Sequence, residues 1–255
     1  MNMQFIVNKL KISGRIMKRV EVNKRARTKK RFLNVCLVIF IAVLLVAGVI
    51  LLLIEPIKRR NRAKISNEAL TFISEKMEET KESEMTYVVP AMGNEVEGEE
   101  YDFIEETEQP EPTQAPKANV TLRSIGIINI SKINVKYSVW DEATKVSLRY
   151  GPGHYPDSVM PGEVGNATIL GHNYKDGSMF HKLGQLKKGD KVVFTSKDGK
   201  EKVFYVEESK IIKAADLIKY IVGDITDKRQ LTLVTCTYEK GNKGWRRVVI
   251  CRMKG

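Results

Sequence analysis

The chain has 255 residues, of which 42% are hydrophobic and 29% are charged, and its formal net charge is +12. This apolar fraction is too high for a chain that is disordered throughout. Three cysteines are too few, and odd in number, for a disulfide framework. The length is enough for one or two ordinary domains.

The charge is divided among three blocks. Residues 1–64 contain 16 lysines and arginines against 2 acidic residues, residues 65–119 contain 3 against 15, and residues 120–255 contain 24 against 14. The chain is therefore basic, then acidic, then basic again, and each block needs its own explanation.

Residues 32–54 form an apolar run, FLNVCLVIFIAVLLVAGVILLLI, without a charged side chain. As a helix, a run of this length spans the roughly 30 Å hydrocarbon core of a bilayer. The apolar region of a secretory signal peptide is shorter, about 7–15 residues, and ends at a small-residue cleavage site. The sequence Glu-Pro-Ile-Lys that follows the run is not such a site. We therefore predict a retained transmembrane anchor at 32–54.

The distribution of basic residues predicts how this anchor is oriented. Eleven lysines and arginines precede the run, and five follow it within residues 58–64. The larger cluster favours a cytoplasmic segment at 1–31, with everything after residue 55 outside the cell. Its position beside the membrane accounts for the basic block, so we expect no nucleic-acid partner.

Residues 55–119 are predicted to form an extracellular stalk and an acidic linker. Apolar residues at helical spacing indicate a helix within 65–88; they are Ile65, Ala69, Phe72, Ile73 and Met77. Because this stripe is narrow, we expect a short stalk helix rather than a core element. From Pro90 the sequence becomes acidic and poor in apolar residues, which is typical of a flexible linker.

Residues 120–255 are long enough for one folded domain with its own core. Helices are expected at 141–150, with Asp141 as a possible cap, and at 214–222. The segments with a strand pattern are 124–130, 132–139, 166–172, 190–196, 200–212, 230–236 and 245–251. Many short strands with few helices favour a closed or nearly closed β-barrel.

Three features of this domain could carry chemistry. Cys236 and His172 each end a predicted strand, and Arg246 and Arg247 begin the last one. A cysteine thiolate can attack a carbonyl, a histidine can transfer the proton, and an arginine can stabilise an oxyanion. Taken singly, however, a strand cysteine is usually a small buried side chain, and a lone histidine or an arginine pair usually has no catalytic role.

Other uses of these residue types are less well supported. A zinc site made by His172 and Cys236 lacks the paired ligand spacings that such sites show. His154 lies in a Gly-Pro-Gly turn and His181 in an expected surface helix, so neither ends a predicted strand. Cys251 lies far along its strand from Cys236, so we expect no disulfide between them.

The segment TLVTC at 232–236 resembles the T-L-x-T-C signature of sortases, the cysteine transpeptidases of Gram-positive cell surfaces. Segments 169–180 and 245–250 are similar to those that carry the sortase histidine and arginine, and 151–166 and 183–194 also resemble sortase segments in the same order. The resemblance covers roughly residues 120–255. It implies a mostly β protein: a closed, eight-stranded sortase-type β-barrel with short helices, here preceded by one transmembrane helix and a stalk.

The resemblance also implies roles for individual residues. Cys236 would attack the peptide carbonyl, and His172 would be the general acid and then the base. Arg247 would stabilise the bound peptide and the oxyanion, because in the family the arginine directly precedes the β-branched run. Strand alternation says only that Arg246 and Arg247 face opposite ways. Thr235 would line the substrate groove, and no metal or cofactor is implied.

The partners implied are surface proteins that bear an LPxTG-like sorting signal, with a peptidoglycan precursor or a pilin lysine as the amine acceptor. The sequence has features of both class B and class D sortases. Three alternatives stay open: a pilin-polymerising sortase, a cysteine hydrolase or wall-modifying transpeptidase of another fold, and a non-catalytic, membrane-tethered domain that binds anionic wall polymer through its basic surface.

Overall fold

The computed structural model describes residues 3–79, 85–90, 119–222, 225–238, 241 and 244–254, with side chains in the first range for 34–50, 52–54 and 56–78. The chain divides into two compact units, Met1–Lys58 and Arg59–Gly255. The acidic linker predicted from Pro90 onward lies largely outside the described residues.

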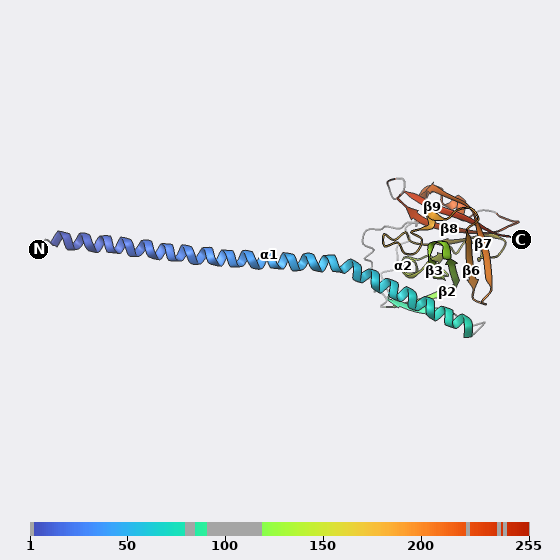
Figure 1. Cartoon of the computed structure of the whole chain (residues 1–255), viewed down its shortest axis with the longest axis horizontal. Coiled ribbons are helices and arrows are strands. Elements are labelled where there is room, and N and C mark those ends of the chain that lie inside the picture. Colours follow the sequence, from blue (N-terminus) through green and yellow to red (C-terminus); the bar gives the residue numbers. More distant parts are fainter. Residues whose placement is uncertain are drawn as a thin grey trace. The chain divides into compact units, whose positions relative to one another are not determined.

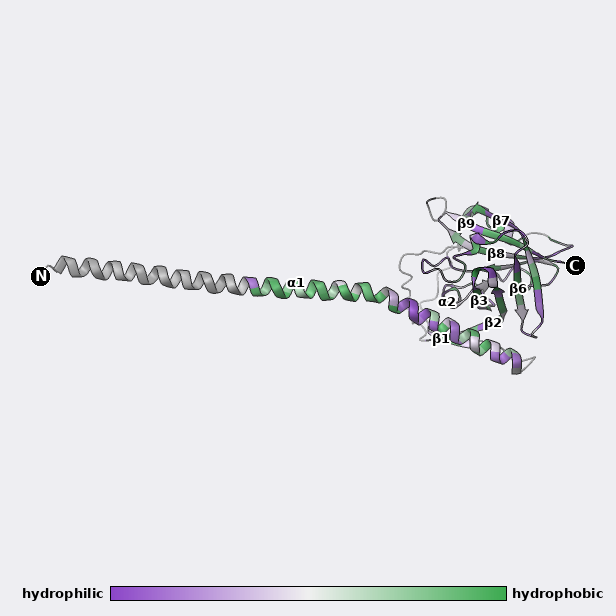
Figure 2. Ribbon diagram, in the orientation of Figure 1, coloured by the Kyte–Doolittle hydropathy of each residue, from purple (hydrophilic) through white to green (hydrophobic). Residues whose placement is uncertain are grey.

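Helix α1, Met3–Glu79, contains the apolar run, which is green in Figure 2. Between Asn34 and Glu78 this helix is long and apolar enough to cross a membrane, and among the described residues the side chains of its most apolar stretch are exposed. Leu52, for example, is 78% exposed. The length and composition of a membrane-spanning helix, as predicted from residues 32–54, are thus present.

The second unit is built on one sheet, and Figure 1 shows its strands. The strand order is β1-β2-β3-β4-β5-β8-β9-β7-β6, and β6 also pairs with β2. This last pairing closes strands β2 to β9 into an eight-stranded barrel and confirms the predicted fold class. Strand β1 lies outside the closed ring and pairs with the first part of β2. The strands are β1 Thr86–Pro90, β2 Asn119–Ile130, β3 Val135–Trp140, β4 Gly153–His154, β5 Gly165–Leu170, β6 Lys191–Ser196, β7 Glu201–Lys213, β8 Arg229–Thr237 and β9 Trp245–Met253.

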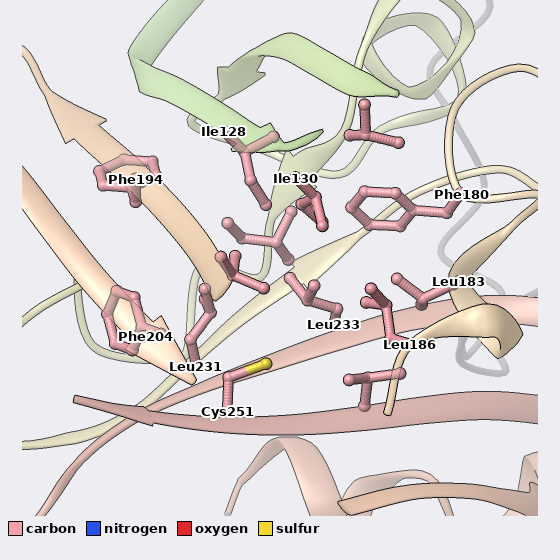
Figure 3. Packing of buried hydrophobic residues seen from close by; sticks show 14 of the residues in the cluster. Ile128, Ile130, Phe180, Leu183, Leu186, Phe194, Phe204, Leu231, Leu233 and Cys251 are labelled. Atoms are coloured by element: carbon pink, nitrogen blue, oxygen red, sulfur yellow. The ribbon is translucent and has the colours of Figure 1, made fainter. Parts of the chain in front are cut away.

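The main hydrophobic core fills the barrel, and Figure 3 shows part of it. Alternation along β8 sends Leu231 and Leu233 into this core. Val234 and Cys236, in contrast, belong to a second cluster, which we call the outer cluster. Its buried members are Leu148, Leu170, Ile212, Leu217, Ile221, Val234, Cys236 and Val248.

Short helical segments connect the strands: η1 Ser131–Ile133, α2 Lys145–Tyr150, η2 Leu183–Gln185, η3 Ala214–Asp216 and α3 Ile218–Ile221. The helix expected at 141–150 begins later than predicted. Its cap is Thr144 rather than Asp141. The Thr144 hydroxyl accepts a hydrogen bond from the Ser147 backbone amide, and the Ser147 hydroxyl accepts one from the Thr144 backbone amide.

The part of α1 in the second unit, Arg59–Glu79, is here called the docked helix. Ala69 packs with Val89, Leu122, Trp140 and Tyr150, and Ile73 packs with Met85 and Ile127. Both helix residues have 0% exposure. The predicted helix is therefore present, but it is a packed element of the folded unit rather than the free stalk that its narrow apolar stripe indicated.

Candidate active site

Strands β5, β8 and β9 lie side by side, and their ends bring the predicted site residues to one edge of the barrel. β5 runs parallel to β8 with Leu170 beside Val234, and β9 runs antiparallel to β8. His172 follows β5, Cys236 lies near the end of β8, and the two arginines lie near the start of β9.

The backbone after β5 stays bonded to β8 beyond the last ladder pair. The Gly171 amide donates to the Val234 carbonyl at 3.0 Å, and the Asn173 side-chain amide donates to the Cys236 carbonyl at 2.8 Å. His172 therefore lies beside Cys236. Because side chains alternate, both residues continue the face on which Leu170 and Val234 join the outer cluster. Both are buried, with 7% and 6% exposure.

The two arginines are separated by the register of β8 and β9. Arg246 is paired with Cys236, and on its other side with Ile212 of the outer cluster. Residues directly opposite each other in an antiparallel pair share a face, so the Arg246 side chain stands on the Cys236 side of the sheet. Arg246 is only 5% exposed.

Arg247 stands on the other face. It is paired with Thr235 and Ile211, and its Nη1 donates to the Ser209 hydroxyl at 3.4 Å. Its guanidinium packs over Gly184 of η2, with Nε 3.2 Å from the point where a β-carbon would lie on that glycine. The register thus favours Arg246 over the sequence-based choice of Arg247 as the arginine beside the thiol.

Thr235 also faces away from Cys236. Its hydroxyl donates to the Gly171 carbonyl at 2.7 Å, and the residue is 2% exposed. This bond ties the segment that leads into His172 to β8. The geometry therefore supports a role in holding the histidine segment in place rather than the groove-lining role expected from the sequence.

Burial, together with the nearby positive charges of Arg62 and Arg149, lowers the pKa of His172 from its ordinary value to about 3. The imidazole is consequently neutral at physiological pH. A neutral imidazole beside a thiol has a ring nitrogen that can accept the thiol proton, because the thiolate formed in that step is an adjacent negative charge that stabilises the imidazolium.

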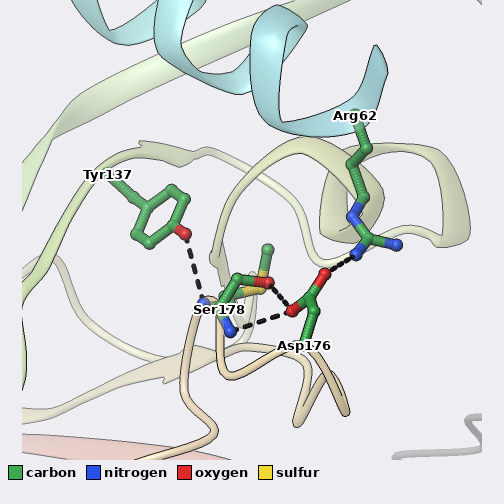
Figure 4. Close-up of polar contacts among 5 residues, drawn as sticks. Arg62, Tyr137, Asp176 and Ser178 are labelled. Carbon is green, nitrogen blue, oxygen red and sulfur yellow. Dashed lines mark hydrogen bonds and ion pairs between the residues drawn. The ribbon is translucent and has the colours of Figure 1, made fainter. Parts of the chain in front are cut away.

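The loop that follows His172 folds back onto it. The His172 amide donates to the Met179 sulfur at 3.0 Å, and Met179 forms a bridge with Asn173. At the tip of the loop, Asp176 accepts hydrogen bonds from Ser178 and forms an ion pair with Arg62 of the docked helix at 2.6 Å, as Figure 4 shows. The sequence pattern predicted a role in the site for none of these supporting residues. For Arg62 no local signal existed, because its partner is distant in sequence.

A cavity of about 410 Å³ lies between this loop and the end of β8. It is lined by Asn173, Lys175, His181, Thr237 and Tyr238. Asn173 and Thr237 directly follow His172 and Cys236 in the chain, so the cavity borders the candidate site.

The other histidines and cysteines occupy different settings. His154 is buried, and its Nε2 lies 3.0 Å from both the Val159 carbonyl and the Ser158 hydroxyl. His181 is exposed, with Nδ1 2.8 Å from Asn173 Oδ1. Cys251 is paired with Leu231 inside the barrel, far along the strand from Cys236 as expected, and burial raises the pKa of its thiol.

Among the described residues, no group of three or more histidine, cysteine or acidic side chains is arranged to hold a metal ion. None of the three cysteines, all of which lie among the described residues, forms a disulfide. The arrangement at the ends of β5, β8 and β9 offers a thiol, a neutral imidazole and a guanidinium, which together suit acyl transfer through a covalent cysteine intermediate.

Comparison with known proteins gives consistent matches to one family. Residues 128–254 match the family model of the sortase domain. The chain is 31% identical over 116 residues to Sortase D of Bacillus subtilis strain 168, a match that covers 46% of this chain and 56% of that protein. It is 27% identical over 168 residues to Sortase A of Bacillus anthracis, covering 64% and 77%.

Among solved structures, the chain is similar to a Clostridium perfringens Sortase D5 transpeptidase, with 28% identity, a TM-score of 0.46 and coverage of 52% and 79%. The chain spans a little over half the length of the Bacillus subtilis relative that it matches.

Proposed function

Because the chain belongs to the sortase family, we propose that it is a membrane-anchored cysteine transpeptidase that cleaves an LPxTG-like sorting signal and transfers the acyl part to an amine. The observation that carries this proposal is the bonding of residues 171–173 to residues 234–236, which brings His172 beside Cys236.

The first half of the proposed reaction forms a thioester. The neutral His172 imidazole takes the thiol proton of Cys236, and the sulfur attacks the peptide carbonyl. The carbonyl oxygen gains negative charge, which Arg246 is placed to stabilise from the same face of the sheet. The C–N bond then breaks, and His172 returns the proton to the leaving amine.

The second half transfers the acyl group. A neutral acceptor amine attacks the thioester carbon and forms the new C–N bond. His172 removes a proton from the attacking nitrogen, the C–S bond breaks, and its electron pair leaves with the sulfur. The Cys236 thiolate takes this proton from His172, which restores the resting thiol and the neutral imidazole. Water in place of the amine would give hydrolysis.

The location proposed for this activity is the outer face of the cell membrane. The apolar part of α1 supports a single-pass anchor, and the excess of basic residues before it supports a cytoplasmic N-terminus. The partners proposed are surface proteins with a sorting signal, and either a peptidoglycan precursor or a pilin lysine as acceptor. Protease treatment of intact cells tests the orientation, because a C-terminal tag should be removed and an N-terminal tag retained.

The experiment for the activity uses the full chain in detergent with a small set of LPxTG-like peptides and triglycine as the amine. Mass spectrometry should detect peptide cleaved between threonine and glycine and an amide product with triglycine. Cys236→Ala should abolish both, whereas the matched control Cys251→Ala should retain them because Cys251 lies inside the barrel. Cleavage by Cys236→Ala at the wild-type rate would overturn the proposal, and a free acid as the sole product would make the protein a hydrolase.

A further inference from the structure

Two ring contacts connect the docked helix to His172. The guanidinium carbon of Arg62 lies 3.5 Å from the centroid of the Tyr174 ring, and the rings of Tyr174 and His172 have centroids 4.9 Å apart, tilted by 56°. We propose that Arg62 is a positioning residue for His172, so that the docked helix holds the site histidine in its reactive place. This inference rests on the proposed function.

The same arginine also fixes the loop that follows His172. Its Nη2 atom forms an ion pair with Asp176 Oδ2 at 2.6 Å. The other carboxylate oxygen of Asp176 accepts hydrogen bonds from the Ser178 backbone amide at 2.9 Å and from the Ser178 hydroxyl at 2.5 Å. Figure 4 shows Arg62 reaching from the helix to this turn. Arg62 therefore contacts the loop at two points, one on the ring beside the imidazole and one at the tip.

The opposite end of the loop is held by the barrel. The Met179 amide donates to the Tyr137 hydroxyl at 3.1 Å, and the Met179 sulfur accepts the His172 amide. With the loop held on the barrel side by Tyr137 and on the outer side by Arg62, the His172 ring has little room to move relative to Cys236.

The docked helix can hold the Arg62 side chain in a defined place because one face of the helix is packed against the folded unit. Arg62, Ser66, Ala69 and Ile73 recur at intervals of four, three and four residues, which places them on one face of a helix. Ser66, Ala69 and Ile73 are buried against the unit. Arg62 is the polar end of this buried face, and its side chain is 22% exposed.

The charge of Arg62 acts on the same imidazole. A nearby cation disfavours the imidazolium, and Arg62 contributes to the low pKa of His172 after burial, together with Arg149 of α2. Further ionisable groups lie on the elements around the ring: Arg246 and Cys236, which share its face, Lys175 and Asp176 in its loop, Arg59 on the docked helix, and the phenols of Tyr137 and Tyr174. Loss of the Arg62 charge should therefore raise the pKa of His172, while burial still keeps it below the ordinary value.

The test compares Arg62→Gln, Arg62→Lys and the matched control Arg60→Gln in the full chain in detergent, with a sorting-signal peptide and triglycine. Misplaced catalytic groups lower the rate of chemistry far more than binding. We expect Arg62→Gln to lower kcat about tenfold or more with little change in KM, and to move the acid limb of the pH profile to higher pH. Arg62→Lys, which keeps the charge without the planar stack, should restore the pH profile but only part of kcat. Arg60 is exposed on the same helix, so Arg60→Gln should behave as wild type.

A second measurement does not depend on activity. Titration of His172 by nuclear magnetic resonance should give a higher pKa in Arg62→Gln than in the wild type, and thermal unfolding of each variant shows whether the fold is kept. An unchanged pKa and an unchanged kcat in a folded Arg62→Gln chain would overturn the inference. If that result occurs while Cys236→Ala is inactive, the proposed function stands and only the role of Arg62 fails. If the wild-type chain cleaves no peptide, the proposed function fails and the titration still decides the coupling.

Discussion

Arg246 of β9 lies directly opposite Cys236 of β8, and this antiparallel pairing puts both side chains on the same face of the sheet. Arg247, the next residue, is opposite Thr235 and packs over Gly184 on the other face. The register thus separates two adjacent arginines into one beside the thiol and one away from it.

This separation predicts different effects for two equivalent substitutions. Arg246→Gln should lower kcat/KM for peptide cleavage by about 100-fold or more, since it removes a charge placed to stabilise the oxyanion. Arg247→Gln should lower it only a few-fold. Steady-state kinetics of both variants checks the assignment. Equal losses, or a larger loss in Arg247→Gln, would return the role to Arg247.

Which of the two arginines lies beside the thiol could not be predicted from the sequence. The family resemblance around Cys236, the predicted strand end at His172 and the strand patterns of 230–236 and 245–251 were sufficient to predict the barrel and to single out the thiol and the imidazole. Alternation required that the arginines face opposite ways, but which of them faces Cys236 depends on the β8–β9 register. That register is set by the connection between the strands and by packing, and neither can be deduced from strand pattern alone.

The docked helix was only partly predictable for a related reason. Its spacing indicated a helix, but two of its contact residues, Ser66 and Ala69, are small and add little to an apolar stripe. Ala69 is buried because it packs against β1, β2 and neighbouring elements, and Ser66 is buried as well; such burial is a tertiary property.

Substitution of Ile73 tests whether this helix belongs to the folded unit. Ile73 has 0% exposure, so Ile73→Ala should lower the free energy of unfolding by about 2–5 kcal/mol through lost burial and a residual cavity. Ile57→Ala, at a position that is 53% exposed, is the control and should leave the unfolding of the barrel unchanged. Urea denaturation of the full chain in detergent measures both, and equal stabilities would place the helix outside the folded unit.

The low pKa of His172 predicts how stability depends on pH. In the unfolded chain a histidine has a pKa near 6.5, whereas here burial holds it at about 3. Between these values the unfolded chain binds a proton that the folded chain does not, so the free energy of unfolding falls as the pH drops below 6.5. The slope from this one group is about 1.4 kcal/mol per pH unit. Above pH 6.5 the contribution is fully present.

Denaturation of the His172→Gln variant between pH 7 and pH 5 should show this slope reduced relative to wild type. His181→Gln is the matched control, because His181 is exposed, and it should keep the wild-type slope. A His172→Gln chain with an undiminished slope would show that His172 is not buried in its neutral form.

The glycine before the histidine should also be sensitive to substitution. A β-carbon on Gly171 would lie 2.5 Å from the ring of Phe180, which has 0% exposure. Gly171→Ala should therefore destabilise the fold by about 1–3 kcal/mol and displace the His172 segment, lowering kcat. Adding Phe180→Leu should relieve the clash and restore part of kcat. A Gly171→Ala chain with wild-type activity and stability would contradict the packing described for this segment.

Trapping the acyl-enzyme tests whether Cys236 is the nucleophile. The full chain is mixed with a sorting-signal peptide without an amine, quenched in acid within the first turnovers, and measured by intact mass and peptide mapping. We expect a mass increase equal to the N-terminal part of the cleaved peptide, located on Cys236, removed by hydroxylamine and absent in Cys236→Ala. An acyl group on another residue, or product formation with no covalent species on the thiol under conditions where it should accumulate, would contradict it.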